Sequence, residues 1–532
     1  MKRTLPPAFL TLIIGIALAG SASATTYYIA ANGSDANSGT SESTPWAHLP
    51  GMATWTGSHT PTAGDVFILR GCDVWGNSSL PITWTWSGTS GSPITIDRDV
   101  TWYNSTNCTS GWNRAVLDAQ GEVIPSGANQ CAGSHHFLQV NSAQYVTFKW
   151  IEARRFFWNI DANNSCWNAA GHIISSGSDY LTVDSWYIHD WTHATTAGTT
   201  DQGINVIQQE NSTPACQHCV IQNSVIDNTD GDGADCSSTH TMCSGGGVEE
   251  WSAKNNIWKG TVEAWYGPTW GPATIEIGGN NISHLNMSFT NPTQSGPVHP
   301  NCIEPTGTVT GTVTLMVHDN WIHNISVCEG AQLGNGNETD YVWNNIWDMG
   351  ATATAGANGP QVPQSSSSTW SFYFWNNTVR WASGCVNNAG HGGAAKNFYL
   401  QNNHCINDGS IVTGGGWSPS GGTAIDHNVA MTNATATSQG YTTSENYVFS
   451  PTASTNSTVG AGISVASLWP AGFPTNDTTL ACLEQTVGGV VESVCPTRSD
   501  TTARTSTWDA GAYLWVNSSA PTPPTGLTAS VQ

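Results

Sequence analysis

Short stretches of alternating apolar and polar residues recur along the chain, and many lead into Asn followed by another apolar residue. Alternation with a period of two is typical of a β-strand with one buried face. The clearest examples are residues 220–226, 254–258, 284–289, 317–322, 342–347, 374–379, 399–403 and 426–429. One Asn from each gives positions 223, 256, 286, 320, 345, 377, 403 and 428, at intervals of 25 to 34 residues.

A constant core repeat with variable spacing predicts stacked coils joined by loops of different length. Asn at the bend tolerates a left-handed backbone, and its amide can bond to its neighbour in the next coil. Segments around 148–151 and 183–188 carry the pattern without the Asn. An antiparallel β-sandwich would need hairpin signals at shorter, more regular spacing, and few are present. The sequence therefore predicts an all-β, single-stranded parallel β-helix.

Several segments near the N-terminus and one near the C-terminus carry a resemblance to a known group. Residues 26–35, with Gly39-Thr40 and Pro45-Trp46, resemble the opening segment of pectate-lyase-like right-handed parallel β-helix proteins. Residues 64–71 and 90–96 are similar to the parts that follow, and residues 509–513 resemble the closing segment. The resemblance implies a right-handed solenoid with an N-terminal cap over residues 25–516. The group contains lyases, hydrolases, epimerases and proteins without known catalysis, so it implies a fold and leaves the reaction open.

Both ends of the chain are expected to lie outside this domain. Residues 1–24 combine Lys2 and Arg3, an apolar stretch and a small-residue cleavage site at 22–24, which is typical of a secretory signal. No second apolar stretch is long enough to cross a bilayer, so a secreted protein, extracellular or periplasmic, is predicted. Residues 517–532 are rich in Pro and Thr, and a flexible tail is predicted there.

Charge excludes some partners. The chain has 14 Lys and Arg against 37 Asp and Glu, a net charge of −23. Such a surface repels nucleic acid and anionic membranes, so neither is an expected partner. The protein is expected to be a monomer. The 26 Trp residues include candidates for stacking on sugar rings, although many must fill the core.

Fourteen Cys in an exported chain predict disulfides. Cys216 and Cys219, followed by Cys236, His240 and Cys243, loosely resemble a zinc site. The spacing fits no structural zinc pattern well, so disulfides are favoured.

Three Glu residues each follow an apolar residue in strands that precede the Asn segments: Glu249, Glu276 and Glu304. Aligned by this pattern, they predict one outward column on three consecutive coils. Strands lie about 4.8 Å apart, so the outer two would be separated by roughly 9.6 Å. Stacked carboxylates need a cation or a raised pKa.

This column is compatible with two reactions. In a lyase, Ca²⁺ held by the carboxylates neutralises a uronate, and Lys254 is the nearest candidate base. In a hydrolase, two carboxylates act as acid and base, and inverting enzymes separate them by about 6.5–9.5 Å. A solvated polar face without chemistry is the third interpretation.

A second candidate site is a loop with the spacing of a calcium loop, in which Asn228, Asp230 and Asp232 would be ligands. Thr239 stands where a bidentate Glu is expected, and a plain polar turn is the alternative. Ca²⁺ is thus the one cofactor that the sequence suggests.

Other candidates flank the Glu column. His299, in a segment resembling one on the active face of β-helix enzymes, can act as acid or base, although Asn301 replaces the Asp of that segment and a structural role is the alternative. Trp251, Trp265, Tyr266 and Trp270 are candidates to bind sugar, with core packing as the alternative. Together these features predict a secreted protein that cleaves a polysaccharide, by Ca²⁺-assisted elimination or inverting hydrolysis. The alternative function is a non-catalytic glycan-binding or adhesion protein.

Overall fold

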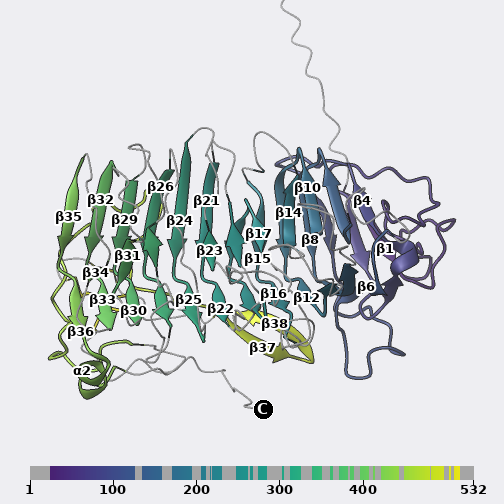
Figure 1. Ribbon diagram of the computed structural model, residues 1–532. Helices are drawn as coiled ribbons and strands as arrows, with labels where there is room; N and C mark the ends of the chain where they lie inside the picture. The colour runs from purple at the N-terminus through teal and green to yellow at the C-terminus, as the bar shows by residue number, and fades with distance from the viewer. Residues whose placement is uncertain are drawn as a thin grey trace, which may run out of the picture.

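The computed structural model shows a long parallel solenoid, with strands stacked side by side along its axis (Figure 1). The structure describes residues 24–125, 135–158, 171–193, 205–210, 216, 218–229, 247–261, 264–267, 273–283, 302–304, 312–324, 338–349, 360–362, 371–380, 384–388, 396–406, 411–413, 421–441, 449–479, 481–495, 503–504 and 508–515. The signal segment up to residue 23 and the tail at 517–532 lie outside these residues, and their boundaries stay predictions.

Each coil visits three sheets in turn, which we number in that order. Sheet 1 contains, from the N-terminal end, β4 (Ile82–Trp84), β7 (Leu138–Asn141), β10 (Gly171–Ser176), β14 (Asn205–Glu210), β17 (Val248–Glu249), β20 (Trp265–Tyr266) and β23 (Ile303–Glu304). Three further strands precede sheet-2 strands in the same way and pair with one another: β28 (Gln361–Val362), β31 (Val386–Asn388) and β34 (Val412–Thr413).

Sheet 2 is a ladder of thirteen strands: β1 (Thr26–Ile29), β2 (Val66–Leu69), β5 (Ile94–Asp97), β8 (Gln144–Lys149), β11 (Asp179–Asp184), β15 (Val220–Gln222), β18 (Ser252–Lys254), β21 (Ala273–Gly278), β24 (Val313–His318), β26 (Glu338–Trp343), β29 (Ser371–Trp375), β32 (Asn397–Gln401) and β35 (Thr423–Asp426).

Sheet 3 completes the coils with β3 (Val74–Gly76), β6 (Ala115–Glu122), β9 (Ile151–Trp158), β12 (Tyr187–His189), β16 (Val225–Asp227), β19 (Ile257–Lys259), β22 (Asn281–Ser283), β25 (Trp321–His323), β27 (Ile346–Asp348), β30 (Thr378–Arg380), β33 (His404–Ile406) and β36 (Val429–Met431), while β13 (Thr192–His193) pairs with β9. The pairs within these ladders are parallel, for example β21 with β24 and β25 with β27. Crossovers between parallel strands are right-handed as a rule, and the predicted right-handed parallel β-helix is confirmed.

The turn from sheet 2 to sheet 3 is the most regular part of each coil. One residue there adopts a left-handed backbone, with φ of 57° at Asn255, 54° at Asp319 and 53° at Asn376. The next residue is a buried Asn whose side-chain oxygen accepts the backbone N–H of the equivalent Asn one coil earlier, at 2.9 to 3.1 Å. This ladder contains Asn256, Asn280, Asn320, Asn345, Asn377, Asn403 and Asn428.

Two members of the predicted Asn series are wrong or untested. Asn223 is the left-handed residue of its turn, and Ser224 occupies the ladder position, donating its N–H to Asn256 at 2.9 Å. Asn286 lies outside the described residues, and Asn280 is the ladder residue of that coil. Asn is favoured at the left-handed residue of the turn as well as at the ladder position, so the sequence alone does not tell which of the two positions Asn223 occupies.

The interior of the solenoid is filled by one continuous apolar cluster, to which every coil contributes. Its largest fully buried side chains include Trp84, Trp186, Trp251, Trp258 and Trp265. Much of the Trp content is therefore core packing, because close-packed interiors require large apolar volumes.

The chain closes the solenoid at its N-terminal end and then returns along its side. Residues 24–125, with the short 3-10 helix η1 (Asn77–Ser79), cover the first coils with Trp46, Leu49 and Met52 in the core. After α2 (Asn433–Ser438), residues 449–515 run back over the sheet 2 to sheet 3 turns, and the hairpin of β37 (Leu483–Val487) and β38 (Val490–Val494) lies beside β16 (Figure 1).

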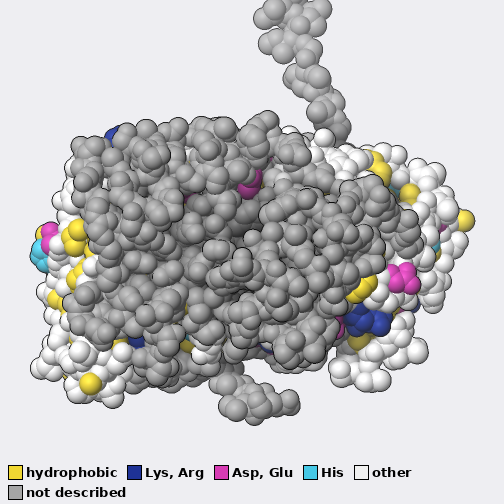
Figure 2. All heavy atoms as spheres, viewed as in Figure 1, with side chains coloured by type: hydrophobic (Ala, Val, Ile, Leu, Met, Phe, Trp, Pro, Cys, Tyr) yellow, Lys and Arg dark blue, Asp and Glu magenta, His cyan; other side chains and the backbone are white. Residues whose placement is uncertain are grey.

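Four disulfides join described residues, as predicted for an exported chain: Cys72–Cys108, Cys216–Cys219, Cys385–Cys405 and Cys482–Cys495. Within the described part of the chain, no helix is long and apolar enough to cross a bilayer. On the face shown in Figure 2, the described hydrophobic side chains are scattered single positions toward the two ends of the solenoid.

Candidate functional site

Two of the three predicted Glu residues share a column on sheet 1. Strands β17, β20 and β23 are consecutive, and Glu249 pairs in register with Tyr266, which pairs with Glu304. Their preceding residues, Val248, Trp265 and Ile303, are buried in the core, so the column takes the alternate positions of the pleat. Glu249 and Glu304 are therefore two strand spacings apart, or roughly 9.6 Å.

Glu276 does not belong to this column, and the prediction of three stacked Glu residues is wrong. It lies on β21 of sheet 2, between β18 and β24. The coil between Glu249 and Glu304 contributes Tyr266 to sheet 1 instead. A buried apolar residue precedes the Glu on both sheets, because alternation with a period of two indicates which face of a strand a residue occupies and not which sheet the strand joins.

Glu276 is instead the centre of an ion-pair network on the outer face of sheet 2. Its carboxylate lies 2.5 Å from Lys254 Nζ and 3.3 Å from His318 Nε2. The other ring nitrogen of His318 lies 2.8 Å from the Asp319 carboxylate. His318 also stacks on Trp343, with ring centroids 4.5 Å apart. We call Lys254, Glu276, His318 and Asp319 the sheet-2 network.

The sheet-2 network holds Glu276 and His318 in their charged forms. Burial acts to raise the pKa of Glu276, but hydrogen bonds from His318 and Lys254 outweigh it and lower the pKa to about 2. Burial acts to lower the pKa of His318, but Asp319 and Glu276 outweigh it and raise the pKa to about 9. Near neutral pH the carboxylate is therefore a weak base and the imidazolium holds its proton. Lys254, the candidate base for elimination, is engaged by Glu276.

Two predicted sugar-binding Trp residues are core residues, and that prediction is wrong for them. Trp251 and Trp265 are 0% and 1% exposed. The indole N–H of Trp251 donates to Gln209 at 3.1 Å, and that of Trp265 donates to the Trp251 carbonyl at 2.8 Å. Neither ring has a face free for a sugar. Tyr266 occupies the column between Glu249 and Glu304, while Trp270 and His299 lie outside the described residues.

The described part of the predicted calcium loop has a structural role. Asn228 is fully buried, and its side-chain oxygen accepts the backbone N–H of Trp191 at 3.0 Å. Asp230 and Asp232 lie outside the described residues, so the calcium site stays a prediction.

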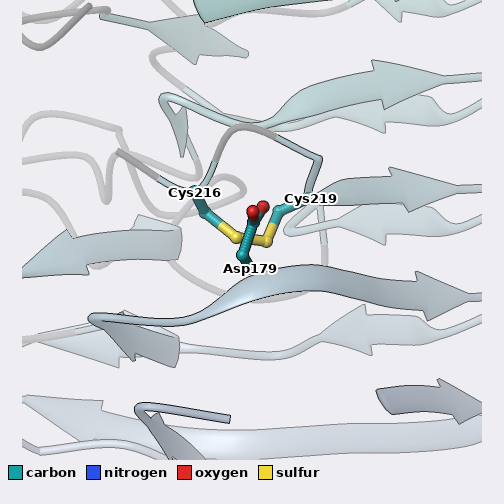
Figure 3. A group of neighbouring side chains, drawn as sticks. All are labelled: Asp179, Cys216 and Cys219. Carbon is teal, nitrogen blue, oxygen red and sulfur yellow. A yellow bond between two sulfur atoms is a disulfide. The ribbon is translucent and has the colours of Figure 1, made fainter. Parts of the chain in front are cut away.

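Among the described residues, one group has the ligand types and spacing of a metal site: Asp179, Cys216 and Cys219 (Figure 3). The two sulfurs are bonded to each other, so neither is a thiolate ligand. Asp179 accepts the backbone N–H of His218 at 2.9 Å and lies 3.1 Å from its Nδ1. A disulfide beside a hydrogen-bonded carboxylate, rather than zinc, explains this group.

A row of outward residues on sheet 2 was missed, although the sequence carries a signal for it. Glu276, Met316, Tyr341, Tyr373 and Tyr399 each stand four residues before a ladder Asn and share one register. The three Tyr rings stack, with centroids 5.0 and 5.3 Å apart. Counting back from the ladder Asn would have assigned Glu276 to sheet 2.

No family model matches the chain, and no curated protein matches it in sequence. Among solved structures, pectate lyase Pel9A is 14% identical, with a TM-score of 0.45, over 93% of this chain and 97% of that one. A GH136 lacto-N-biosidase from Eubacterium ramulus is 11% identical, with a TM-score of 0.41, over 77% and 68%. PfbA, a surface adhesin of Streptococcus pneumoniae, is 10% identical, with a TM-score of 0.34, over 74% and 89%.

These neighbours differ in activity, and at such identities none of their activities is carried over to this chain. The architecture rests on the strand pairing itself, which is that of a parallel β-helix.

Proposed function

We propose that this chain is a secreted carbohydrate-active β-helix enzyme that hydrolyses a polysaccharide with inversion, using Glu249 and Glu304. The observation that carries the proposal is the register on sheet 1, which separates these residues by two strands with Tyr266 between them. Roughly 9.6 Å between the two backbone positions leaves room for a sugar and a water.

The reaction assigned to the pair is a single displacement. One carboxylic acid gives its proton to the glycosidic oxygen as that bond breaks, and the other carboxylate removes a proton from the attacking water. The second carboxyl ends protonated and the first ends ionised, so one exchange with solvent resets the pair. Tyr266 is proposed to position the sugar between them.

Elimination is the second candidate reaction, with Lys254 as base and Ca²⁺ bound by Asp230 and Asp232. It requires Lys254 to leave Glu276, to which it is paired at 2.5 Å, and to act across from sheet 2. The net charge of −23 also opposes an acidic polysaccharide unless cations bridge the two. Hydrolysis of a neutral substrate needs neither condition.

The disulfides and the net charge support proposals for the location and the partner of the protein. Four disulfides among the described residues support an oxidising, exported location. The acidic balance opposes nucleic acid as a partner and is compatible with a neutral polysaccharide. We propose that the protein acts as a monomer.

The test is a screen of the purified mature protein against xylan, glucomannan, cellulose, pectate and alginate, with Ca²⁺ or with a chelator. Reducing ends and the ultraviolet absorbance of unsaturated products are read together, and proton NMR identifies the first anomer released. The proposal predicts reducing ends without absorbance, an inverted anomer, and turnover that survives the chelator. Absorbance that depends on Ca²⁺ would establish elimination instead. Binding without turnover on every substrate would establish the non-catalytic alternative.

A further inference from the structure

The outer face of sheet 2 contains a surface cavity of about 510 Å³. It spans four consecutive strands, β15, β18, β21 and β24, and lies on a different sheet from Glu249 and Glu304. Its polar lining comes from His218, Ser252, Lys254, Thr274, Thr312 and Thr314. The volume lies within the range of small-ligand pockets, and hydroxyl groups dominate its polar lining.

One wall of the cavity is an aromatic ring with an open face. Tyr145, Tyr180 and His218 form a stack, with centroids 4.4 and 4.0 Å apart and planes inclined by 13° and 2°. Tyr180 covers one face of His218, and the His218 side chain is 47% exposed where it lines the cavity. Asp179 holds this ring in place through the Nδ1 contact at 3.1 Å. A fixed ring with an open face is a platform for the apolar face of a sugar.

The charge of the cavity favours a neutral ligand. Among the described residues that line the cavity, Lys254 is the one with a permanent charge, and Glu276 neutralises it at 2.5 Å. The ammonium group keeps donor capacity, since it has three N–H groups. The wider surface is strongly acidic, which opposes binding of a uronate.

The neighbouring aromatic row has less free ring surface at its centre. Tyr373 is stacked between Tyr341 and Tyr399, so both of its faces are covered. Among the described residues that line the cavity, His218 supplies the aromatic ring and the adjacent hydroxyls supply hydrogen bonds.

We propose that this cavity is a second carbohydrate-binding site, which holds a neutral sugar unit by stacking on His218 and by hydrogen bonds from Ser252, Thr274, Thr314 and Lys254. It is an accessory site that retains the protein on a neutral polysaccharide, and it functions independently of the Glu249–Glu304 pair.

Calorimetry with neutral xylohexaose, mannohexaose and cellohexaose as probes, and trigalacturonate as the acidic comparison, tests this site. Thr274→Trp fills the cavity from an exposed strand position, and we expect at least about 10-fold weaker binding of the neutral probe. His218→Asn removes the ring and keeps a donor toward Asp179, and we expect about 5-fold weaker binding.

Matched controls are available at the far end of the same sheet. Thr423→Trp adds the same bulk on exposed β35, and His427→Asn removes an exposed His that is paired with Asp426 at 3.0 Å. Both should leave affinity unchanged, and circular dichroism checks that all four variants fold.

Failure of this site is distinguishable from failure of the proposed catalysis. Loss of binding in Thr274→Trp with normal affinity in Glu304→Gln supports the accessory site, whether or not turnover is found. Binding that survives Thr274→Trp, or that is lost only in Glu304→Gln, overturns it. Absence of binding of all three neutral probes at millimolar concentration also overturns it.

Discussion

Glu276 on sheet 2 and the Glu249–Glu304 pair on sheet 1 each follow a buried apolar residue in a strand, yet they belong to different faces of the solenoid. Glu276 has Lys254 and His318 within 3.3 Å, and its pKa falls to about 2 because these cations outweigh the effect of burial. The sheet-1 column pairs Glu249 and Glu304 with Tyr266, which has no charge to offer. A carboxylate neutralised by its neighbours stabilises the fold, whereas the proposed hydrolysis requires carboxyl groups that exchange protons with a substrate.

A carboxyl group inside the solenoid provides a third environment for comparison. Asp340 on β26 is fully buried, opposite Leu315 and Phe372. Burial and the neighbouring Glu338 raise its pKa well above the usual value. Burial disfavours the charged form of both Glu276 and Asp340, and the cations near Glu276 reverse that effect on its pKa.

The largest expected difference between the two outer faces is in turnover. Glu249→Gln and Glu304→Gln should each lower kcat by about 10³-fold, and the double variant should lose little more, because the pair acts as a unit. Glu276→Gln should change kcat by less than about 3-fold. These values come from initial rates on the substrate found by the screen. Equal losses in all three single variants would remove the distinction between the faces.

The free energy of unfolding should depend on Glu276 on sheet 2, which is the reverse of the order expected for kcat. Glu276→Gln leaves Lys254 and His318 without their shared anion, and we expect the free energy of unfolding to fall by about 2 kcal/mol. Denaturant titration at pH 7 measures this, with Glu42→Gln on the exposed cap as a control that should stay within about 0.5 kcal/mol. An unchanged midpoint for Glu276→Gln would show that the network does not stabilise the fold.

The interior carboxyl should make stability fall as pH rises. Because the folded pKa of Asp340 is raised, its contribution is present below the unfolded pKa near 3.8 and is lost as pH rises through the folded value. Asp340→Asn should therefore gain stability relative to the native protein between pH 5 and pH 9. A pKa difference of one unit corresponds to about 1.4 kcal/mol. A constant difference between the two proteins across this range would contradict the assignment.

The smallest effect is the pH dependence of the sheet-2 network. The folded pKa of His318 is about 9 against 6.5, so its contribution is complete below pH 6.5 and is lost as pH rises through 9. The stability difference between the native protein and His318→Gln should shrink by about 1 kcal/mol over this interval. The stacking of His318 on Trp343 adds an offset that does not depend on pH, so only the slope tests the network.

Much of the solenoid was predictable because its determinants are local. Alternation gave strands, and Asn at a left-handed turn marked the same point in coil after coil, as Asn255–Asn256 and Asn376–Asn377 show. The disulfides followed from composition and the expected location. These features depend on the backbone preferences of single residues, which the sequence carries directly.

The site was only partly predictable. Glu249 and Glu304 share one backbone register on sheet 1, and their role stays a prediction, whereas Glu276, Trp251 and Trp265 were misplaced. Alternation with a period of two does not indicate which sheet a strand joins, so Glu276 was assigned to the wrong sheet. A Trp whose indole N–H donates to another protein group can be buried, so the sequence does not distinguish a core Trp from an exposed one.

The sequence by itself determined that this chain forms stacked parallel coils with an Asn ladder and an acidic surface. Only the tertiary structure decided which carboxylates meet a cation. That choice depends on which coils lie next to each other after loops of unequal length, and a charge interaction depends on distance rather than on sequence separation. Lys254 and His318 are 64 positions apart in the chain, and both contact Glu276.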